Sequence, residues 1–210
     1  MEFKFSCDFI EFESKVWYRG IDFEYESQQL LEVLNQATKE NDVQSYIKSS
    51  EKWFIPASLF KDYDFGHHEA FLLPEKSLGA EYRVDYLLIG KNSGGYHFVF
   101  VEFEDVNVPY KLLRSNEESS PVRKGLVQIN DWKRWMDKNK EYFLSNLGLP
   151  FKVFNISSWS IHYCLVVSRR EKMDDIAREM REQKAFDIPG LRIVSYDRLV
   201  DNVRRLTNGF

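Results

Sequence analysis

The stretch that most constrains this chain runs from residue 81 to 104 and reads EYRVDYLLIGKNSGGYHFVFVEFE. Its two halves are rich in β-branched and aromatic residues. Between them lies the segment KNSGG, whose residues form turns and tolerate a positive φ angle. This pattern predicts a β-hairpin with strands at 83–89 and 96–103, and the rest of the chain has to be arranged around it.

The predicted hairpin carries three carboxylates, Asp85, Glu102 and Glu104. If a loop at 92–95 closes the hairpin, counting back along both strands places Asp85 opposite Glu102 on one face, and Glu104 shares that face. Like charges placed opposite each other destabilise a strand pair, so we expect a cation between them. A register shifted by one residue would instead move Asp85 to the other face.

The remaining apolar pattern predicts alternating helices and strands. We expect a short antiparallel β element in residues 1–26, and then helices at 28–37, 40–54, 121–144, 169–183 and 196–206, with strands at 160–168 and 191–195. This order predicts an α/β fold, a mixed β-sheet core flanked by helices and preceded by the N-terminal β element. We therefore divide the chain into an N-terminal element, 1–26, and one domain, 27–210.

Composition restricts the possible partners and compartment. The formal net charge is −4, so no overall basic field attracts nucleic acid, and a polyanion would have to meet a local basic patch. Two cysteines make no disulfide framework, which predicts a reducing cytoplasm. No run approaches the ~20 apolar residues that a membrane span requires, so we expect no membrane partner.

Convergent carboxylates suit hydrolysis of a phosphodiester by a divalent metal. Mg²⁺ or Mn²⁺ prefers carboxylate oxygens, lowers the pKa of its bound water and neutralises charge on the phosphate. Asp85, Glu102 and Glu104 are the candidate ligands. Lys124 and Gln128 fall on one face of the helix predicted to follow, where they could orient the water or the phosphate.

The adjacent His67 and His68 are a weaker metal candidate. No third spaced His or Cys accompanies them, so we expect a structural or surface role. Zinc sites built on cysteine are excluded because the chain has no paired cysteines. The sequence also lacks the nucleophile elbow of a serine hydrolase and a phosphate-binding glycine loop.

Several of these stretches resemble a known family. Asp85, then Glu102-Phe103-Glu104, then a helical Gln128 resemble the PD-(D/E)XK nuclease superfamily. The segments ENDVQSYIKSSEKWF, SLGAEYRVDYLLI, VFVEFED with LVQINDWKRWM, and LRIVSYDRLVDNV resemble the nuclease domain of Shedu-type bacterial anti-phage defence proteins. The resemblance covers about residues 28–206.

The resemblance implies a restriction-endonuclease-like fold for the domain 27–210. It implies that Asp85 and Glu102 bind Mg²⁺ or Mn²⁺, that Glu40 is a supporting acid, and that Gln128 belongs to the site. It also implies a DNA substrate, a homo-oligomer (dimer or tetramer) and a role in cleaving or nicking invading DNA. It does not explain residues 1–26, which could contact a protein partner.

The chain departs from the superfamily two residues after Glu102, where the motif has lysine and this sequence has Glu104. Lys124 or Lys111 could supply the ammonium from elsewhere, Glu104 could bind a second metal ion, or the site could be inactive. We therefore expect a metal-dependent DNA endonuclease of anti-phage defence. The alternative is a catalytically inactive nuclease-like scaffold or a protein-interaction subunit of a defence system.

Overall fold

A mixed sheet of seven strands organises the fold in the computed structural model, which describes residues 5–6, 9–12, 20–147 and 156–208. The strand order is β1-β2-β3-β6-β7-β8-β9. The strands are β1 (Phe5–Ser6), β2 (Phe9–Glu11), β3 (Glu69–Pro74), β6 (Tyr86–Asn92), β7 (Gly95–Phe103), β8 (Ile161–Val166) and β9 (Leu191–Val194). Strands β1 to β7 pair antiparallel, whereas β8 and β9 continue the sheet in parallel pairs. The predicted α/β class with a mixed sheet is confirmed.

Strands β6 and β7 form the predicted hairpin near the middle of this sheet. Tyr86 pairs with Val101, so the next position outward sets Asp85 opposite Glu102, as the loop-based count predicted. Strand β6 begins at Tyr86 rather than Arg83, because Arg83 belongs to β5 (Tyr82–Arg83). Strand β5 pairs with β4 (Ser77–Leu78) in a separate two-stranded sheet.

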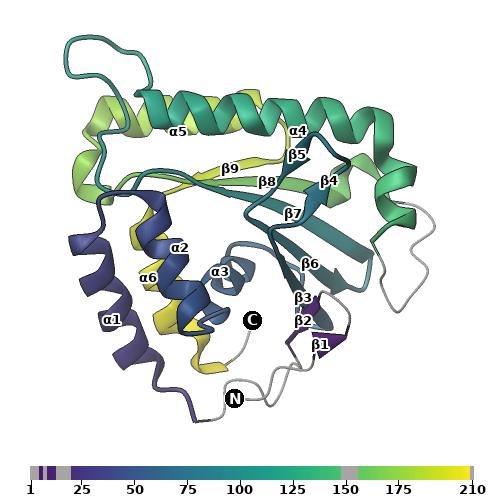
Figure 1. Ribbon diagram of the computed structural model, residues 1–210. Coiled ribbons are helices and arrows are strands. Elements are labelled where there is room, and N and C mark those ends of the chain that lie inside the picture. The colour runs from purple at the N-terminus through teal and green to yellow at the C-terminus, as the bar shows by residue number, and fades with distance from the viewer. Residues whose placement is uncertain (1–4, 7–8, 13–19, 148–155, 209–210) are drawn as a thin grey trace.

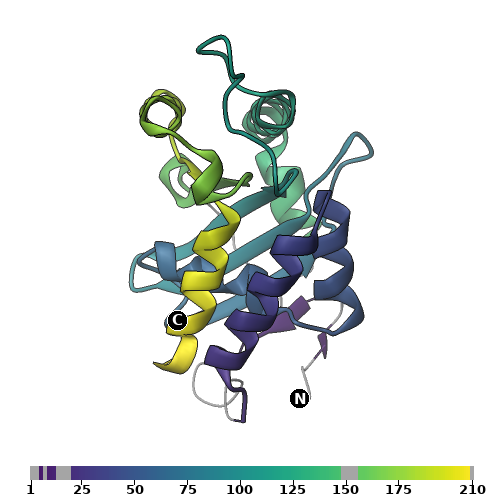
Figure 2. The ribbon, with the colours of Figure 1, turned by 90° about the vertical axis from the view of Figure 1, so that its left-hand side faces the viewer.

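Helices cover both faces of the sheet (Figure 1). Helices α4 (Ser120–Ser145) and α5 (Asp175–Asp187) lie on one face, and the other face is covered by α1 (Phe23–Gln36), α2 (Glu40–Ser49), α3 (Phe54–Ala57) and α6 (Tyr196–Arg204), as the turned view in Figure 2 also shows. Alternate residues of β7 point to the two faces of the sheet. Val101 packs in the hydrophobic cluster that includes α1 and α6, and Phe100 packs in the hydrophobic cluster that includes α4. This burial on both faces explains the nearly continuous apolar run of β7.

The N-terminal β element is an antiparallel pair, as predicted, but it joins the main sheet instead of forming a sheet ahead of it. Strand β2 pairs with β3, so β1 and β2 extend one edge. Helix α1 begins five residues before the predicted residue 28, because Asp22 caps it by accepting a hydrogen bond from the Tyr25 N–H at 3.0 Å. The part of the expected β element at 13–19 lies outside the described residues.

Other boundaries shift for local reasons. Helix α2 ends at Ser49 rather than 54, because α3 begins as a separate short helix. Helix α5 begins at Asp175 rather than 169, because the Asp174 carboxylate caps it by accepting from the Ala177 N–H at 2.8 Å. Among the described residues, none of the helices combines the length and apolar character needed to cross a membrane.

Candidate active site

The hairpin carboxylates gather where β7 ends. Glu102 and Glu104 are buried, with 4% and 2% of their surfaces exposed. Asp85, just before β6, accepts a hydrogen bond from the backbone N–H of Phe103 at 2.7 Å, which holds it against the strand that carries Glu102. The register of the hairpin thus places these acids in one neighbourhood, as its pattern of paired positions requires.

One ammonium group lies among the acids. The Nζ atom of Lys124 is 3.0 Å from Glu104 Oε1 and 3.8 Å from Glu40 Oε2. Glu40 is the first residue of α2, and Lys124 stands in the second turn of α4, so two helices on opposite faces contribute to the cluster. A cation therefore lies beside Glu104 although the motif position itself holds no lysine.

Glycine at position 125 permits this approach. A Cβ atom there would lie 2.4 Å from Leu165 Cδ1 and 3.1 Å from Glu104 Cγ. The first distance is shorter than Cβ contacts in proteins, and the second is tighter than most of them. A larger residue at position 125 would therefore push α4 away from the sheet. The neighbouring Lys124 reaches Glu104 because the helix backbone lies this close to β7 and β8.

Burial raises the pKa values of the acids in the cluster. Burial, reinforced by the charges of Asp85, Glu104 and Glu40, raises the pKa of Glu102 to about 10. Burial also raises the pKa of Glu104 to about 7, although the Lys124 ammonium opposes this shift. The pKa values of Asp85 and Glu40 are raised too, in both cases mainly by burial. Additional positive charge would release protons from this cluster near neutral pH.

One orphaned atom indicates that the residues fit a cation. The Oε2 atom of Glu102 is buried and has no hydrogen-bond partner among the described residues. A buried polar atom without a partner is costly, and a hard divalent ion is the kind of ligand that carboxylate oxygens accept. Within the described part of the chain, however, no group of three or more His, Cys, Asp and Glu side chains is arranged to hold a metal ion. Glu40 and Glu104 contact Lys124 instead.

Two supporting residues escaped the sequence-based prediction. Gln44, buried on α2, donates a side-chain hydrogen bond to Asp85, which opposes the rise of the Asp85 pKa that burial causes. The hydroxyl of Tyr196, at the start of α6, donates to the backbone carbonyl of Glu104 at 2.7 Å. In the sequence, the one indication for Gln44 is its position next to Val43, which belongs to the apolar face of this helix. Nothing local marks Tyr196, because its role depends on α6 folding back against β7.

Two hollows open beside the cluster. The smaller, of about 220 Å³, is lined by Glu40, Glu104 and Lys124. The larger, of about 610 Å³, shares Lys124 with it and is also lined by Gln128 and Arg123. Gln128 is half-buried and faces this second hollow. Lys124 and Gln128, the predicted site residues of α4, therefore lie on one continuous surface next to the acids.

The other predicted candidates have their contacts elsewhere. Lys111 pairs with Asp174, with its Nζ atom 3.3 Å from Oδ2, so the nearby cation of the acid cluster is Lys124. His67 and His68 are both exposed, in agreement with the expected surface role.

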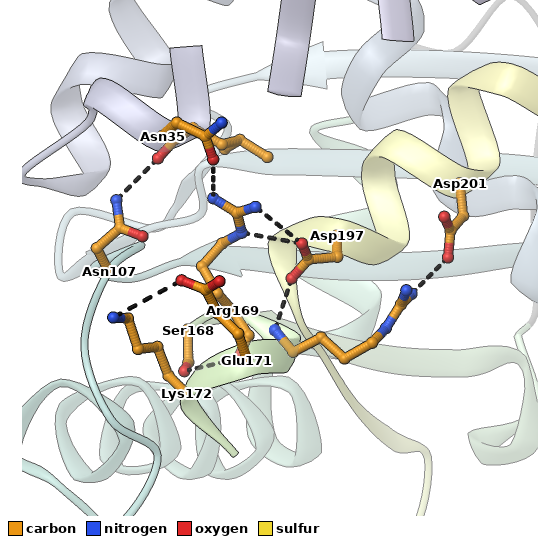
Figure 3. Close-up of polar contacts among 10 residues, drawn as sticks. Asn35, Asn107, Ser168, Arg169, Glu171, Lys172, Asp197 and Asp201 are labelled. Atoms are coloured by element: carbon orange, nitrogen blue, oxygen red, sulfur yellow. Dashed lines mark hydrogen bonds and ion pairs between the residues drawn. The ribbon is translucent and has the colours of Figure 1, made fainter. Parts of the chain in front are cut away.

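A buried arginine ties together the segments that surround the site (Figure 3). The guanidinium of Arg169 donates to Asp197 Oδ1 through Nε at 3.0 Å and to Asn35 Oδ1 through Nη1 at 3.1 Å. Arg169 is 5% exposed. It therefore joins the segment after β8 to the start of α6 by an ion pair with Asp197, and to the end of α1 by a hydrogen bond to Asn35. The preceding Ser168 donates its N–H to the carbonyl of Asp105, one residue after Glu104, at 3.1 Å.

Comparison with known families adds an independent observation. The family model described as "Shedu protein SduA, C-terminal" matches residues 37–200. The matched segment contains all the acids of the cluster, Lys124 and Gln128, and it leaves out the β1–β2 pair. No curated protein matches the sequence.

Proposed function

Because the chain belongs to the family of the Shedu protein SduA C-terminal region, which indicates a role in anti-phage defence, we propose that it is a metal-dependent DNA endonuclease. The observation that carries the proposal is the buried cluster of Asp85, Glu102 and Glu104, with the ammonium of Lys124 beside Glu104. The cluster combines carboxylates that can bind a hard cation with a positively charged side chain beside them. Metal-dependent hydrolysis of a phosphodiester uses both kinds of group. The resemblance to PD-(D/E)XK nucleases supports the same chemistry.

We assign the metal, Mg²⁺ or Mn²⁺, to Asp85 and Glu102. The orphaned Oε2 atom of Glu102 and the pKa of about 10 support this assignment, since both mark a buried carboxyl group whose negative charge Lys124 compensates only in part. When bound, such an ion lowers the pKa of its water and offsets charge on the phosphate. The chain itself contributes rigidity, because the hydrogen bond from the Phe103 N–H and that from Gln44 hold the Asp85 carboxylate in place.

Lys124 takes the part that a lysine two residues after Glu102 plays in the superfamily pattern. Its ammonium offsets negative charge on the phosphate and orients the attacking water. Glu104, with a pKa of about 7, accepts the proton of that water at a carboxylate oxygen, since a general base works best when its pKa lies near the working pH. Gln128 and Arg123, in the adjoining hollow, contact the phosphates that flank the cleaved bond.

Incubation of supercoiled plasmid with the protein and Mn²⁺ tests the proposal. We expect nicking or cleavage by the wild-type protein and its loss in Asp85→Asn and Glu102→Gln. Asp187→Asn, which changes an exposed aspartate at the end of α5, is the matched control and should cleave normally. Equal cleavage in the wild type and the site variants, or none in any of them, would rule out the assigned mechanism.

A non-catalytic scaffold is the second candidate. It is favoured by the arrangement of the described acids, which form no group of three around a metal position, and by the pairing of Glu104 with Lys124. Calorimetric titration with Mn²⁺ distinguishes the two. Stoichiometric binding that Glu102→Gln abolishes supports the nuclease, whereas the absence of binding by the wild type supports the scaffold.

A further inference from the structure

A third and larger hollow lies along an open edge of the sheet. Its volume is about 1160 Å³ and its floor is β9, the last strand in the sheet order. Helix α5, which lies beside β9 in Figure 1, forms one wall, and residues 61–64 with the start of α6 form the other. Of the described residues that line it, none lines the two hollows at the acid cluster. We call it the β9 groove.

The β9 groove is positively charged although the whole chain is negative. Three acidic side chains line it against six basic ones: Lys61, Arg170, Arg178, Arg181, Arg192 and Arg198. Four of these cations are ion-paired with carboxylates; one of those carboxylates, Asp201, is drawn at the right of Figure 3. Lys61 and Arg192 form no ion pair within the described part of the chain. Their charge is available to a ligand from outside.

Arg192 is also held in a fixed orientation. Its guanidinium carbon lies 4.9 Å from the centre of the Tyr63 ring, and Tyr63 in turn stacks on Phe65 with ring centres 4.9 Å apart. A guanidinium resting on an aromatic face loses little further freedom when its planar set of N–H donors binds an anion. Phosphate is the anion whose oxygens match this set.

Aromatic surface accompanies these charges. Tyr63 and His162 both line the groove, with ring centres 5.4 Å apart. Burial lowers the pKa of His162 to about 4, so its ring is uncharged near pH 7. Arg192 and Phe65 already rest on the Tyr63 ring, so Tyr63 offers a nucleobase the edge of its ring for contact.

We propose that the β9 groove binds the phosphate of a nucleotide unit, with Arg192 and Lys61 as the contacting cations and Tyr63 beside the base. Pockets of about 300–1,000 Å³ hold small-molecule ligands, so the β9 groove has room for a nucleotide. The same chemistry belongs to a free nucleotide and to one unit of a nucleic acid strand. The site is separate from the acid cluster, and its existence does not depend on nuclease activity.

Binding measurements in EDTA test this site without cleavage. The probes are ATP and, separately, a short single-stranded oligodeoxynucleotide, each titrated by calorimetry into wild-type protein, Arg192→Gln and Lys61→Gln. Arg204→Gln is the matched control, because Arg204 is partly exposed, pairs with Glu24 and lies outside the groove. We expect each groove variant to weaken binding by about tenfold and to lower the slope of log K against log salt by about one, with the control unchanged.

The two probes separate the sources of the ligand. Binding of ATP that depends on Arg192 identifies a free nucleotide, and binding of the oligonucleotide alone identifies a strand. Arg192→Lys keeps the charge but loses the planar set of donors, so its affinity should fall between wild type and Arg192→Gln. Failure of both probes to bind, or equal affinities in the groove variants and Arg204→Gln, would overturn the proposal.

Discussion

The stability of this protein should fall as pH rises, because Glu102 is buried as a protonated acid. Its pKa is about 10 in the folded protein, compared with 4.5 for the free side chain. Between these values the folded state keeps a proton that the unfolded state has released. Each pH unit in this window therefore lowers the free energy of unfolding by up to about 1.4 kcal/mol, which amounts to about 4 kcal/mol from about pH 5 to about pH 8.

Replacing the carboxyl group by an amide removes this dependence. In Glu102→Gln the buried side chain has nearly the same shape but never ionises, so folding no longer has to hold its proton. We expect the variant to match the wild type near pH 5 and to exceed its free energy of unfolding by about 2–4 kcal/mol near pH 8. The lower figure applies if Asp85 and Glu104 share the protons of the cluster.

Urea unfolding followed by tryptophan fluorescence, in EDTA at both pH values, measures the difference. Glu179→Gln changes an exposed glutamate on α5 and should leave the pH dependence of the wild type intact. The reasoning would be refuted if Glu102→Gln gained no more stability than Glu179→Gln on going from pH 5 to pH 8. Adding Mn²⁺ should raise the midpoint of the wild type and leave that of Glu102→Gln unchanged, if the metal binds Glu102 as proposed.

Four further outcomes follow from the site and its support. Lys124→Met should lower cleavage by about 100-fold or more while the protein stays folded, as checked by plasmid nicking and circular dichroism. Cleavage should rise between about pH 6 and pH 8 as Glu104, whose pKa is about 7, loses its proton; a rate that is flat or falls over this range excludes Glu104 as the base. Gly125→Ala should cost about 1–3 kcal/mol in urea unfolding and reduce cleavage, because the added methyl group meets Leu165. Arg169→Ala should cost about 3–5 kcal/mol because it leaves Asp197 without its buried partner, whereas Arg178→Ala, which breaks an exposed pair, should cost less than about 1 kcal/mol.

Local pattern was sufficient to predict the hairpin and its register. The turn residues between positions 91 and 96 leave one favourable loop, and in an antiparallel pair every other opposed position follows from the loop by counting. The opposition of Asp85 and Glu102 could therefore be predicted without any knowledge of the third dimension. The long helix α4 was predicted to within a residue at each end, because its apolar period and its proline near the start are both local signals.

The boundaries of helices and strands were less predictable where a capping side chain or a contact with a distant segment sets them. Asp22 begins α1 ahead of its apolar stripe, and Asp174 delays the start of α5. The N-terminal strands join the edge at β3, a pairing between segments about sixty residues apart that no local pattern specifies. Gln44 and Tyr196 enter the site for the same kind of reason, because α2 and α6 pack against the sheet that carries the acids.

The choice of cation beside Glu104 belongs to the tertiary structure alone. Lys111 lies closer in sequence to Glu104 than Lys124 does, yet Lys111 pairs with Asp174 and Lys124 reaches the acid. That outcome depends on the distance between α4 and the sheet, which Gly125 permits and the packing against Leu165 decides. Strand pairing follows from a fixed backbone repeat, whereas the approach of a helix to a sheet follows from the volumes of all the side chains between them. The acids and two candidate lysines could therefore be predicted from the sequence, but the choice between Lys124 and Lys111 could not.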